Sequence, residues 1–418
     1  MNDSEFVEAL RGLIAIPSVS GKGAGEAPYG EPCAEALRYV LTLCEGFGFR
    51  TKNCAGRVGW AEIGEGEEMV GVLCHLDVVP AGSGWTHDPF GGELSEGNLY
   101  GRGVVDDKGP AMAVIFAMRE LLEQKTPLDR RIRMVFGLAE ETGNWSDMEY
   151  YKQTEELPAF GFTPDADFPA LYGEKGILHL TVRLPGDGLK SLKGGSAVNM
   201  VPDFCEAETA SGEKLSAHGR SAHGSKPAEG ENAISRLAAA LGEKLPDCPF
   251  AKFYNETIGM DTTGAGLDCA LSDPESGALT LNAGTVLLED GVVTLKLDLR
   301  YPVTVPMEEV LHRAENRAQP FGASVSVLDH QDPVFLNRSG PVIQTLMRVY
   351  REETGDDTPP RVIGGGTYAR AMKNIVAYGP LLPGREETEH QKDEYLALDD
   401  LLKAKEIYRS ALQALANG

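Results

Sequence analysis

Long hydrophobic runs are absent from this sequence. Its longest continuous apolar stretch is Ala111–Met118, far shorter than the roughly 20 residues that a helix needs to cross a bilayer. The first ten residues, MNDSEFVEAL, also lack the basic and apolar segments of a secretory signal peptide. These two absences predict a cytoplasmic protein that has no membrane as its partner.

Basic residues and paired cysteines are also scarce. The 39 lysines and arginines stand against 63 aspartates and glutamates, which gives a net charge of −24. A surface of this sign repels phosphate backbones and anionic lipids, so neither nucleic acid nor a membrane is expected to bind. The seven cysteines are scattered and include no CxxC pair, which argues against a disulfide framework or a thiolate metal site.

Hydrophobic periodicity predicts the architecture of the first domain. Apolar runs of strand length occur at Met69–Cys74 and Arg131–Gly137, and a helix pattern lies between them at Ala111–Leu122. Strands that alternate with helices predict an α/β fold with a mixed, largely parallel sheet flanked by helices. In such sheets the reactive residues lie just beyond the strand ends.

The middle of the chain has a different pattern. Strand-like segments at Ile177–Leu184 and Val292–Tyr301 enclose a helix pattern at Asn232–Gly242, which predicts a separate α+β domain. His179 lies within the first of these strands, where we expect it to be packed or exposed at an edge.

Length and the return of helical patterns predict the domain order. A chain of 418 residues exceeds the usual size of a single hydrophobic core. We therefore predict a first domain whose first part spans residues 1–174 and whose second part spans residues 333–418. The α+β domain would be inserted between them, over residues 175–332.

Two short motifs place polar side chains after apolar segments. HLDVVP puts His75 and Asp77 two residues apart at a strand end, so the carboxylate can orient the imidazole. GRGVVDDKGP supplies Asp106 and Asp107 next to a helix start. Adjacent carboxylates in an apolar setting repel each other unless a cation compensates their charge, although a solvated turn would also explain this pair.

Three further motifs add carboxylates and a histidine. LAEETGNW places Glu140 and Glu141 beyond a strand, and TPDADFP and REETEHQKDE contribute Asp165 and His390. Neighbouring side chains diverge, so one glutamate can bind a metal while the other reaches a water molecule. Taken singly, each motif also fits an ordinary surface turn.

Together these residues suffice for two cations that share one carboxylate. Imidazole and oxygen ligands without a thiolate suit zinc, manganese or cobalt. Paired ions of this kind polarise a carbonyl group and supply hydroxide near neutral pH. The combination therefore predicts metal-assisted hydrolysis.

Six motifs in order carry a resemblance to a known family. They are HLDVVPAGSGW, YGRGVVDDKGP, EETGNWSDMEYY, FGFTPDADFP, GGGTYAR and PGREETEHQ. The chain resembles the metallopeptidases that include acetylornithine deacetylase, succinyl-diaminopimelate desuccinylase, aminoacylase and carboxypeptidase G. Within that family it is most similar to the dipeptidase V branch, the Xaa-His or β-Ala-Xaa dipeptidases. The resemblance spans essentially the whole chain and implies a two-metal exopeptidase catalytic domain with an inserted lid domain.

The resemblance also implies roles for the residues of the first domain. The ligands of one metal are implied to be His75, Asp106 and Asp165. Those of the other are implied to be Glu141, His390 and the shared Asp106. Asp77 is implied to orient His75, and Glu140 is implied to act as general base and then as general acid. Two divalent ions are expected, with zinc first and manganese or cobalt as alternatives.

The inserted domain carries motifs that resemble those of the family's lid. They are NMVPD with Asn199, GRSAHGSKPAEGENA with His223, and LDLRYP with Arg300. The resemblance implies that Asn199 and Arg300 hold the carboxyl terminus of a small peptide and that His223 stabilises the oxyanion. The lid between NMVPD and SAHGS is shorter than in monomeric dipeptidases, so the protein is expected as a monomer or a homodimer, with His223 acting in cis or in trans.

The predicted function is metal-dependent hydrolysis of unblocked dipeptides, with Glu140 as the general base and acid. One alternative is an N-acyl amino acid deacylase or carboxypeptidase of the same family, which needs no free amino terminus. A second alternative is a metal-binding homologue without catalysis. A phosphoryl-transfer enzyme is disfavoured because the sequence has no P-loop.

Overall fold

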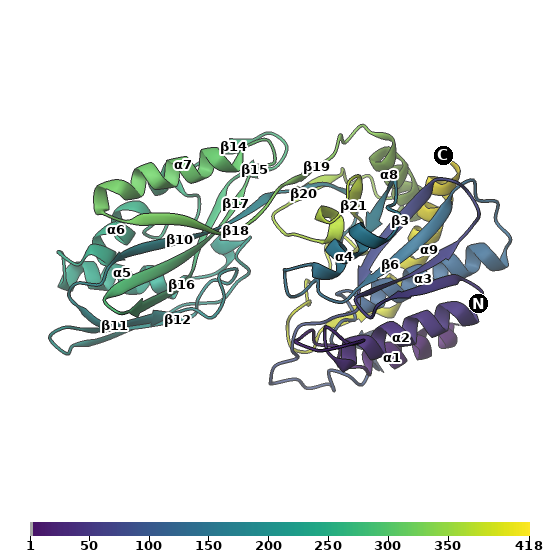
Figure 1. Ribbon diagram of the computed structural model, residues 1–418, viewed down its shortest axis with the longest axis horizontal. Coiled ribbons are helices and arrows are strands. Elements are labelled where there is room, and N and C mark those ends of the chain that lie inside the picture. Colours follow the sequence, from purple (N-terminus) through teal and green to yellow (C-terminus); the bar gives the residue numbers. More distant parts are fainter. Residues whose placement is uncertain (1–2) are drawn as a thin grey trace. The chain divides into compact units, whose positions relative to one another are not determined.

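The structure is a computed structural model that describes residues 3–418, so Met1 and Asn2 of the N-terminal segment lie outside it. The described chain forms two compact units (Figure 1). Unit 1 contains the residues up to Tyr172 together with Leu336–Arg361 and Thr367–Gly418. Unit 2 contains Gly173–Phe335 and Val362–Gly366.

A mixed sheet forms the centre of unit 1. Its four middle strands, β6, β3, β7 and β21, are parallel, whereas β2 and β1 continue the order beyond β6 as antiparallel strands. Their bounds are β1 Arg50–Cys54, β2 Val58–Ile63, β3 Met69–His75, β6 Arg131–Gly137, β7 Phe160–Thr163 and β21 Ile375–Ala377. Beyond β21 the sheet continues through β9 (Leu171–Glu174), which pairs with β19 (Val334–Phe335) and β20 (Arg361–Ile363). The predicted mixed α/β sheet is confirmed.

Helices surround this sheet, and α3 is the most deeply buried of them. Their bounds are α1 Asp3–Ile14, α2 Glu31–Gly46, α3 Lys108–Glu123, α4 Ser146–Thr154, α8 Pro341–Thr354 and α9 Leu398–Asn417. Helix α3 packs against α9 and β3, and Ala111–Met118 within it is wholly buried. The apolar run noted in the sequence is therefore a core helix. It starts at Lys108, three residues before the predicted Ala111, because the hydrophobic pattern left out the charged Lys108, which is buried with the first turn.

Short strands complete unit 1. One small sheet has the order β23, β5, β4, and a two-stranded one joins β22 and β8. Their bounds are β4 Glu93–Ser95, β5 Asn98–Tyr100, β8 Ala166–Asp167, β22 Pro380–Leu381 and β23 Tyr395–Ala397.

Unit 2 is an α+β unit built on a seven-stranded antiparallel sheet. The strand order is β13, β12, β11, β16, β17, β10, β18. Their bounds are β10 Gly176–Pro185, β11 Leu189–Gly194, β12 Phe204–Thr209, β13 Lys214–His218, β16 Thr280–Glu289, β17 Val292–Tyr301 and β18 Ser324–Gln331. Three helices form its second layer: α5 Ala233–Lys244, α6 Pro249–Thr257 and α7 Met307–Ala318. A strand pair, β14 Ser272–Asp273 and β15 Gly277–Ala278, lies outside this sheet.

Alternation along β17 divides its residues between two faces. Leu295, Leu297 and Leu299 are buried in one cluster with residues of α5, α6 and α7. Because successive side chains of a strand point to opposite faces, Asp298 and Arg300 lie on the face away from these helices. The sequence LKLDLRY thus builds a core on one side and a polar surface on the other.

The unit boundaries lie near the divisions expected after residues 174 and 332. They fall between Tyr172 and Gly173 and between Phe335 and Leu336. Val362–Gly366, expected in the second part of the first domain, clusters with unit 2 instead. The reason is local hydrogen bonding, because Lys175 N donates to Ile363 O at 2.9 Å and Arg300 Nη1 donates to Gly364 O at 3.1 Å.

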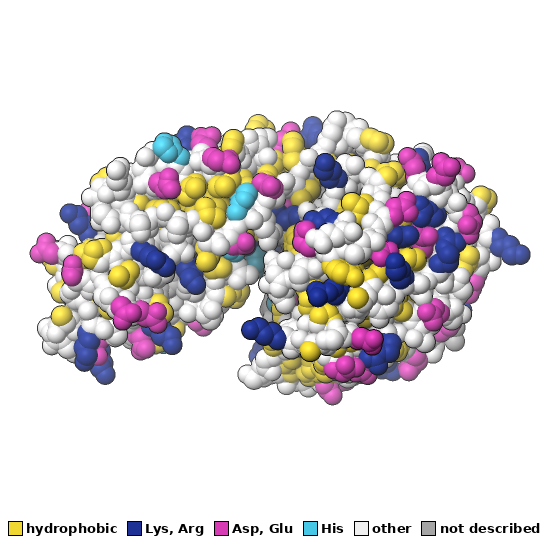
Figure 2. All heavy atoms as spheres, in the orientation of Figure 1, with side chains coloured by type: hydrophobic (Ala, Val, Ile, Leu, Met, Phe, Trp, Pro, Cys, Tyr) yellow, Lys and Arg dark blue, Asp and Glu magenta, His cyan; other side chains and the backbone are white. Residues whose placement is uncertain are grey.

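Two general expectations concern membranes and cysteines. Among residues 3–418, no helix combines the length and the apolar character that a membrane span requires. All seven cysteines are buried and none forms a disulfide. Figure 2 shows acidic and basic side chains interspersed over the face that it draws.

Candidate functional site

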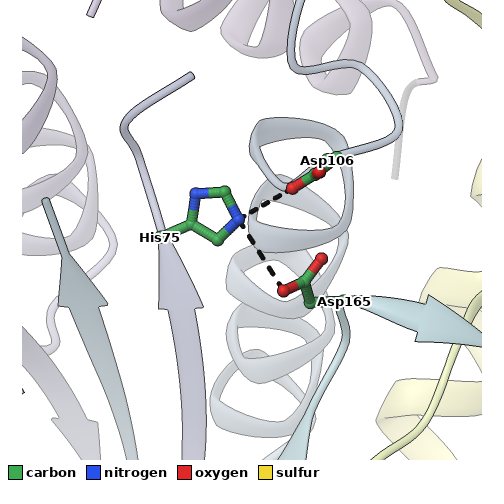
Figure 3. A group of neighbouring side chains, drawn as sticks. All are labelled: His75, Asp106 and Asp165. Carbon is green, nitrogen blue, oxygen red and sulfur yellow. Dashed lines mark ion pairs between the residues drawn. The ribbon is translucent and has the colours of Figure 1, made fainter. Parts of the chain in front are cut away.

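Three predicted metal ligands meet at the carboxyl ends of the central strands of unit 1. His75 is the last residue of β3, Asp106 lies in the turns between β5 and α3, and Asp165 follows β7. Figure 3 shows the imidazole of His75 facing both carboxylates. His75 Nε2 lies 2.8 Å from Asp106 Oδ1 and 3.8 Å from Asp165 Oδ2. One ligand atom from each residue lies within 4.8 Å of the other two, so the three can share one cation.

A second group of three uses the other oxygen of the same aspartate. His390 Nε2 lies 3.0 Å from Asp106 Oδ2 and 3.2 Å from Glu141 Oε2. Glu141 follows the end of β6, and His390 lies in the loop between β22 and β23. Asp106 therefore points Oδ1 toward one histidine and Oδ2 toward the other. This is the arrangement that a bridging carboxylate requires.

Asp107, the neighbour of Asp106, has a different contact. Its Oδ2 accepts a hydrogen bond from the backbone N–H of His75 at 3.2 Å, and it belongs to neither ligand group in the described part of the chain. The peptide bond between the two aspartates is cis. Asp107 thus contacts the backbone of the histidine that Asp106 faces.

Asp77 contacts His75 chiefly through its backbone. The His75 ring Nδ1 lies 2.9 Å from the carbonyl oxygen of Asp77 and 3.5 Å from the carboxylate Oδ1. The two carboxylate oxygens instead accept hydrogen bonds from the backbone N–H groups of Glu140 at 3.3 Å and Glu141 at 3.1 Å. The sequence predicted a carboxylate that orients an imidazole. In the structure this carboxylate fixes the backbone of the two glutamates, and its role in orienting His75 stays a prediction.

A buried aspartate that the sequence analysis did not select supports the same glutamates. Asp147 Oδ2 accepts hydrogen bonds from Leu138 N at 2.6 Å, Ala139 N at 2.9 Å and Tyr368 Oη at 2.5 Å. These contacts hold the backbone that leads from β6 to Glu140. Asp147 and Tyr368 lie within motifs that were noted, but their separation of 221 residues gave no signal that they meet.

A buried ion pair holds the segment that carries Asp106. Arg102 and Glu394 are 2% and 1% exposed, and Arg102 Nη1 lies 2.5 Å from Glu394 Oε2. Glu394 Oε1 also accepts hydrogen bonds from Gly103 N at 3.1 Å and Val105 N at 2.9 Å. Two of the three residues just before Asp106 therefore depend on this one carboxylate. Nothing in the sequence indicated that Glu394 is buried, because it stands in the acidic run around His390 and a glutamate in such a run is usually solvated.

Glu394→Ala is expected to lower the free energy of unfolding by about 3–5 kcal/mol, because it leaves a buried guanidinium without its partner. Urea-induced unfolding measures this change. The matched control is Glu31→Ala, which removes an exposed ion pair with Arg38 and is expected to cost about 0–1 kcal/mol. Equal effects of the two substitutions would contradict the structural role of Glu394.

The electrostatics of the site depend on burial and crowding of carboxylates. Burial raises the pKa of Glu140 well above its usual value, and the charges of Glu141 and Asp106 raise it further against the opposing effect of His75. Burial and the charge of Asp106 likewise raise the pKa of Asp165. Burial also opposes ionisation of Asp106, but His390 and His75 outweigh it and lower the pKa of this carboxyl group. Such a cluster of acids repels itself and gains stability from a cation.

The residues present fit a pair of divalent ions. His75 Nε2 and Asp106 Oδ1 are buried 2.8 Å from each other, but neither makes a hydrogen bond of normal geometry with the described residues, as a buried polar atom usually does. Both atoms face the centre of the first ligand group. Their imidazole and carboxylate chemistry matches the ligands that zinc, manganese and cobalt accept.

The three predicted substrate-binding residues come together within unit 2. Gly224 N, next to His223, donates to Asn199 O at 2.7 Å, and the His223 ring Nδ1 lies 2.7 Å from Ser225 Oγ. A Cβ atom on Gly224 would lie 2.4 Å from Asp298 Oδ2, and that carboxylate binds Arg300. Segments about 100 residues apart in the sequence are therefore neighbours. Their contact with a substrate stays a prediction.

One histidine and one cysteine near His75 in the sequence have ordinary surroundings. His87 stacks on Tyr100 with ring centroids 3.8 Å apart. Cys74 is buried beside His75, and burial raises the pKa of its thiol well above the usual value. Neither belongs to a ligand group within the described residues.

An α/β sheet with two ligand groups that share a carboxylate beyond its strand ends is a site for metal-assisted hydrolysis. The family model described as Peptidase family M20/M25/M40 matches residues 71–414, and the chain belongs to this family. The predicted resemblance is confirmed, and the protein is an enzyme that hydrolyses peptide bonds.

Similar proteins agree with this assignment. The Bacillus subtilis (strain 168) protein named "Putative dipeptidase YtjP" is 37% identical over 455 aligned positions, which cover 99% of this chain and 97% of the relative. Human carnosine dipeptidase 1 has a similar fold, with a TM-score of 0.68 and 16% identity over 100% of this chain and 97% of its own. The dipeptidase Dug1p of Saccharomyces cerevisiae has a TM-score of 0.66 and 13% identity over 99% of this chain and 96% of its own.

Proposed function

We propose that this enzyme is a metal-dependent dipeptidase that hydrolyses the peptide bond of unblocked dipeptides. The observation that carries the proposal is the position of Asp106 between His75 and His390, with Glu140 adjacent to the ligand Glu141. The name of the Bacillus subtilis relative supports the substrate class. So does the motif set of the second unit, which suits a short substrate with a free carboxyl terminus.

Two divalent cations are the proposed cofactors, with zinc first and manganese or cobalt as alternatives. His75, Asp106 and Asp165 would hold one ion, and Asp106, Glu141 and His390 would hold the other. A dinuclear metal-binding peptidase of similar fold from Bacillus subtilis supports the count of two. When bound, the ions polarise the scissile carbonyl group and make water a better nucleophile.

Glu140 is proposed to move the proton. Its carboxylate accepts a proton from the attacking water as the new C–O bond forms, and it delivers that proton to the departing amine nitrogen as the C–N bond breaks. Asp77 fixes the backbone N–H of Glu140 at 3.3 Å, which limits movement of the base. The water molecule thus adds its OH group to the carbonyl carbon and its remaining proton to the amine nitrogen.

Arg300 and Asn199 are proposed to bind the substrate carboxylate, and His223 is proposed to stabilise the oxyanion. A guanidinium has five N–H donors. Arg300 uses one on Nε and one on Nη2 for Asp298 and one on Nη1 for Gly364 O. With respect to the described residues, this leaves one N–H on each terminal nitrogen, and two terminal N–H groups of a guanidinium can bind a carboxylate bidentately.

Location and assembly follow from other features. We propose the cytoplasm as the site of action, because seven buried cysteines without a disulfide suit a reducing compartment. The enzyme would work as a monomer with His223 in cis or as a homodimer with His223 in trans. Sedimentation velocity of the purified enzyme distinguishes these two states.

A small substrate panel tests the proposed function. Metal-stripped protein is supplied with zinc or manganese and assayed on free dipeptides, N-acetylated dipeptides and tripeptides. We expect metal-dependent cleavage of the free dipeptides and at least about 100-fold slower cleavage of the acetylated ones, on the scale of one charged hydrogen bond left unmade in a closed site. Preferred cleavage of acetylated compounds would instead identify a deacylase or carboxypeptidase. No cleavage of any compound would identify a metal-binding homologue without catalysis.

A further inference from the structure

A row of polar side chains crosses the sheet of unit 2 on the face away from the helices. Asp298 of β17 is the register partner of His179 in β10 and of Asn282 in β16. Directly opposed residues of neighbouring strands share a face and lie close enough to interact. None of these three residues was predicted to have a role, and His179 was expected only to pack or to lie at an edge.

Two members of the row hold the residues proposed to bind the substrate carboxylate. Asp298 Oδ1 accepts from Arg300 Nε at 2.8 Å, and Oδ2 accepts from Nη2 at 2.9 Å. Asn282 Nδ2 donates to Val198 O at 3.2 Å and Met200 O at 2.8 Å. These two carbonyl groups flank Asn199, so Asn282 fixes the backbone on both sides of it.

His179 stands behind Asp298. Its Nε2 lies 3.5 Å from Asp298 Oδ1 and is buried without a hydrogen-bond partner among the described residues. On its other side, Nδ1 lies 3.7 Å from Oδ2 of Asp329, an edge residue whose side chain is 55% exposed. The imidazole therefore limits the space in which the Asp298 carboxylate can turn.

Burial makes the Asp298–Arg300 pair rigid. Asp298 is 0% exposed and Arg300 is 4% exposed. Burial of Asp298 favours its neutral form, but the charge of Arg300 outweighs this effect and lowers the pKa of the carboxyl group. A buried guanidinium with a bidentate partner cannot rotate without leaving two charges unpaired. Its two remaining donors consequently keep a fixed direction before any substrate arrives.

We propose that Asp298, with His179 behind it, is a positioning residue that presets Arg300 for the C-terminal carboxylate of the substrate, and that Asn282 beside it presets Asn199. The inference rests on the proposed function, because it assigns Arg300 to the substrate. It adds a specificity determinant that acts through Arg300 and does not touch the reacting atoms. A preset fork saves the entropy that ordering a flexible arginine would cost on binding.

The test compares a free dipeptide with the same dipeptide as its C-terminal amide. We expect Asp298→Asn to lower kcat/KM for the free dipeptide by about 10–100-fold, mainly through KM. The reason is that a less firmly held Arg300 guanidinium makes weaker charged hydrogen bonds to the substrate carboxylate. For the amide, which lacks the carboxylate, we expect less than about a threefold change. Arg300→Met is expected to have the same selective effect. Asp298→Asn combined with Arg300→Met should be no worse than Arg300→Met alone, since residues that act as a unit are not additive.

Two further variants keep the test sharp. Asp329→Asn is the matched control on the exposed side of His179 and is expected to leave both rates within twofold. His179→Phe keeps an aromatic ring, somewhat larger than imidazole, but removes both ring nitrogens. It is expected to reduce the free-dipeptide rate about threefold to tenfold with the amide rate unchanged. This variant therefore still tests the positioning role if Asp298→Asn does not fold.

The outcomes separate the two levels of inference. Equal losses on the dipeptide and the amide, or additive losses in the double variant, would overturn the positioning role while the dipeptidase assignment stands. Wild-type enzyme that ignores free dipeptides would overturn both. If Asp298→Asn and His179→Phe lose activity on the free dipeptide but not on the amide, the positioning role of Asp298 is supported.

Discussion

Glu140→Ala is expected to abolish measurable turnover, with kcat lowered on the order of 10³-fold or more, while the metal content stays near that of the wild type. General acid–base catalysis typically contributes about 10²–10⁴-fold, and here one carboxylate is proposed to act in both directions. Metal content is not expected to fall, because Glu140 belongs to neither ligand group in the described chain. Initial rates on a free dipeptide and metal analysis of the same sample measure both quantities.

The neighbouring glutamate provides the control for this experiment. Glu141 lies 3.2 Å from His390 Nε2 and belongs to the second ligand group. Glu141→Ala should therefore lose metal as well as activity. Both variants would then lose activity, but only Glu141→Ala would lose metal. Activity retained in Glu140→Ala would remove it from its proposed role.

Asp106→Ala is expected to have the broadest effect of any single substitution. Its two oxygens face different histidines, at 2.8 Å and 3.0 Å, so its loss removes a ligand from both groups. We expect loss of both metals and a rate reduction on the order of 10⁴-fold or more, since the cations supply much of the charge stabilisation in such a site. Metal titration followed by activity measurement checks this result.

Asp165→Ala separates the two ligand groups. Asp165 belongs only to the group with His75, so this variant should keep one metal in the group of Glu141 and His390. Equal metal content in Asp106→Ala and in the wild type would contradict a bridging role. Equal metal loss in Asp106→Ala and Asp165→Ala would contradict the division into two groups.

Local pattern was enough to predict many elements. The bounds of β6 and β17 are those that the sequence predicted, at Arg131–Gly137 and Val292–Tyr301. The residue pattern within each segment is enough to predict a strand, and β17 alternates between polar and apolar residues along most of its length. Helix α3 was predicted three residues short at its start, because Lys108 is polar yet buried, with its Nζ donating to Ile16 O at 2.6 Å.

The residues of the two candidate ligand groups were predictable because each follows a strand end or stands in a motif of fixed order. The supports around them were not. Asp147 and Glu394 are acidic residues in polar surroundings of the sequence, and such residues are usually solvated. They are buried only because distant segments supply their partners, as Arg102 does for Glu394 across 292 residues. No short-range pattern encodes such a pairing.

Alternation along β17 constrains how this enzyme can change over evolutionary time. Leucines face the helices at every second position, and Asp298 and Arg300 take the positions between them. Deleting one residue before Asp298 would turn both charges toward the hydrophobic core, because a shift of one residue exchanges the two faces of a strand. Natural variants are therefore not expected to tolerate insertions or deletions in this strand. New substrate preferences have to arise by point replacement on the polar face or by changes of length in the loops beyond the strand.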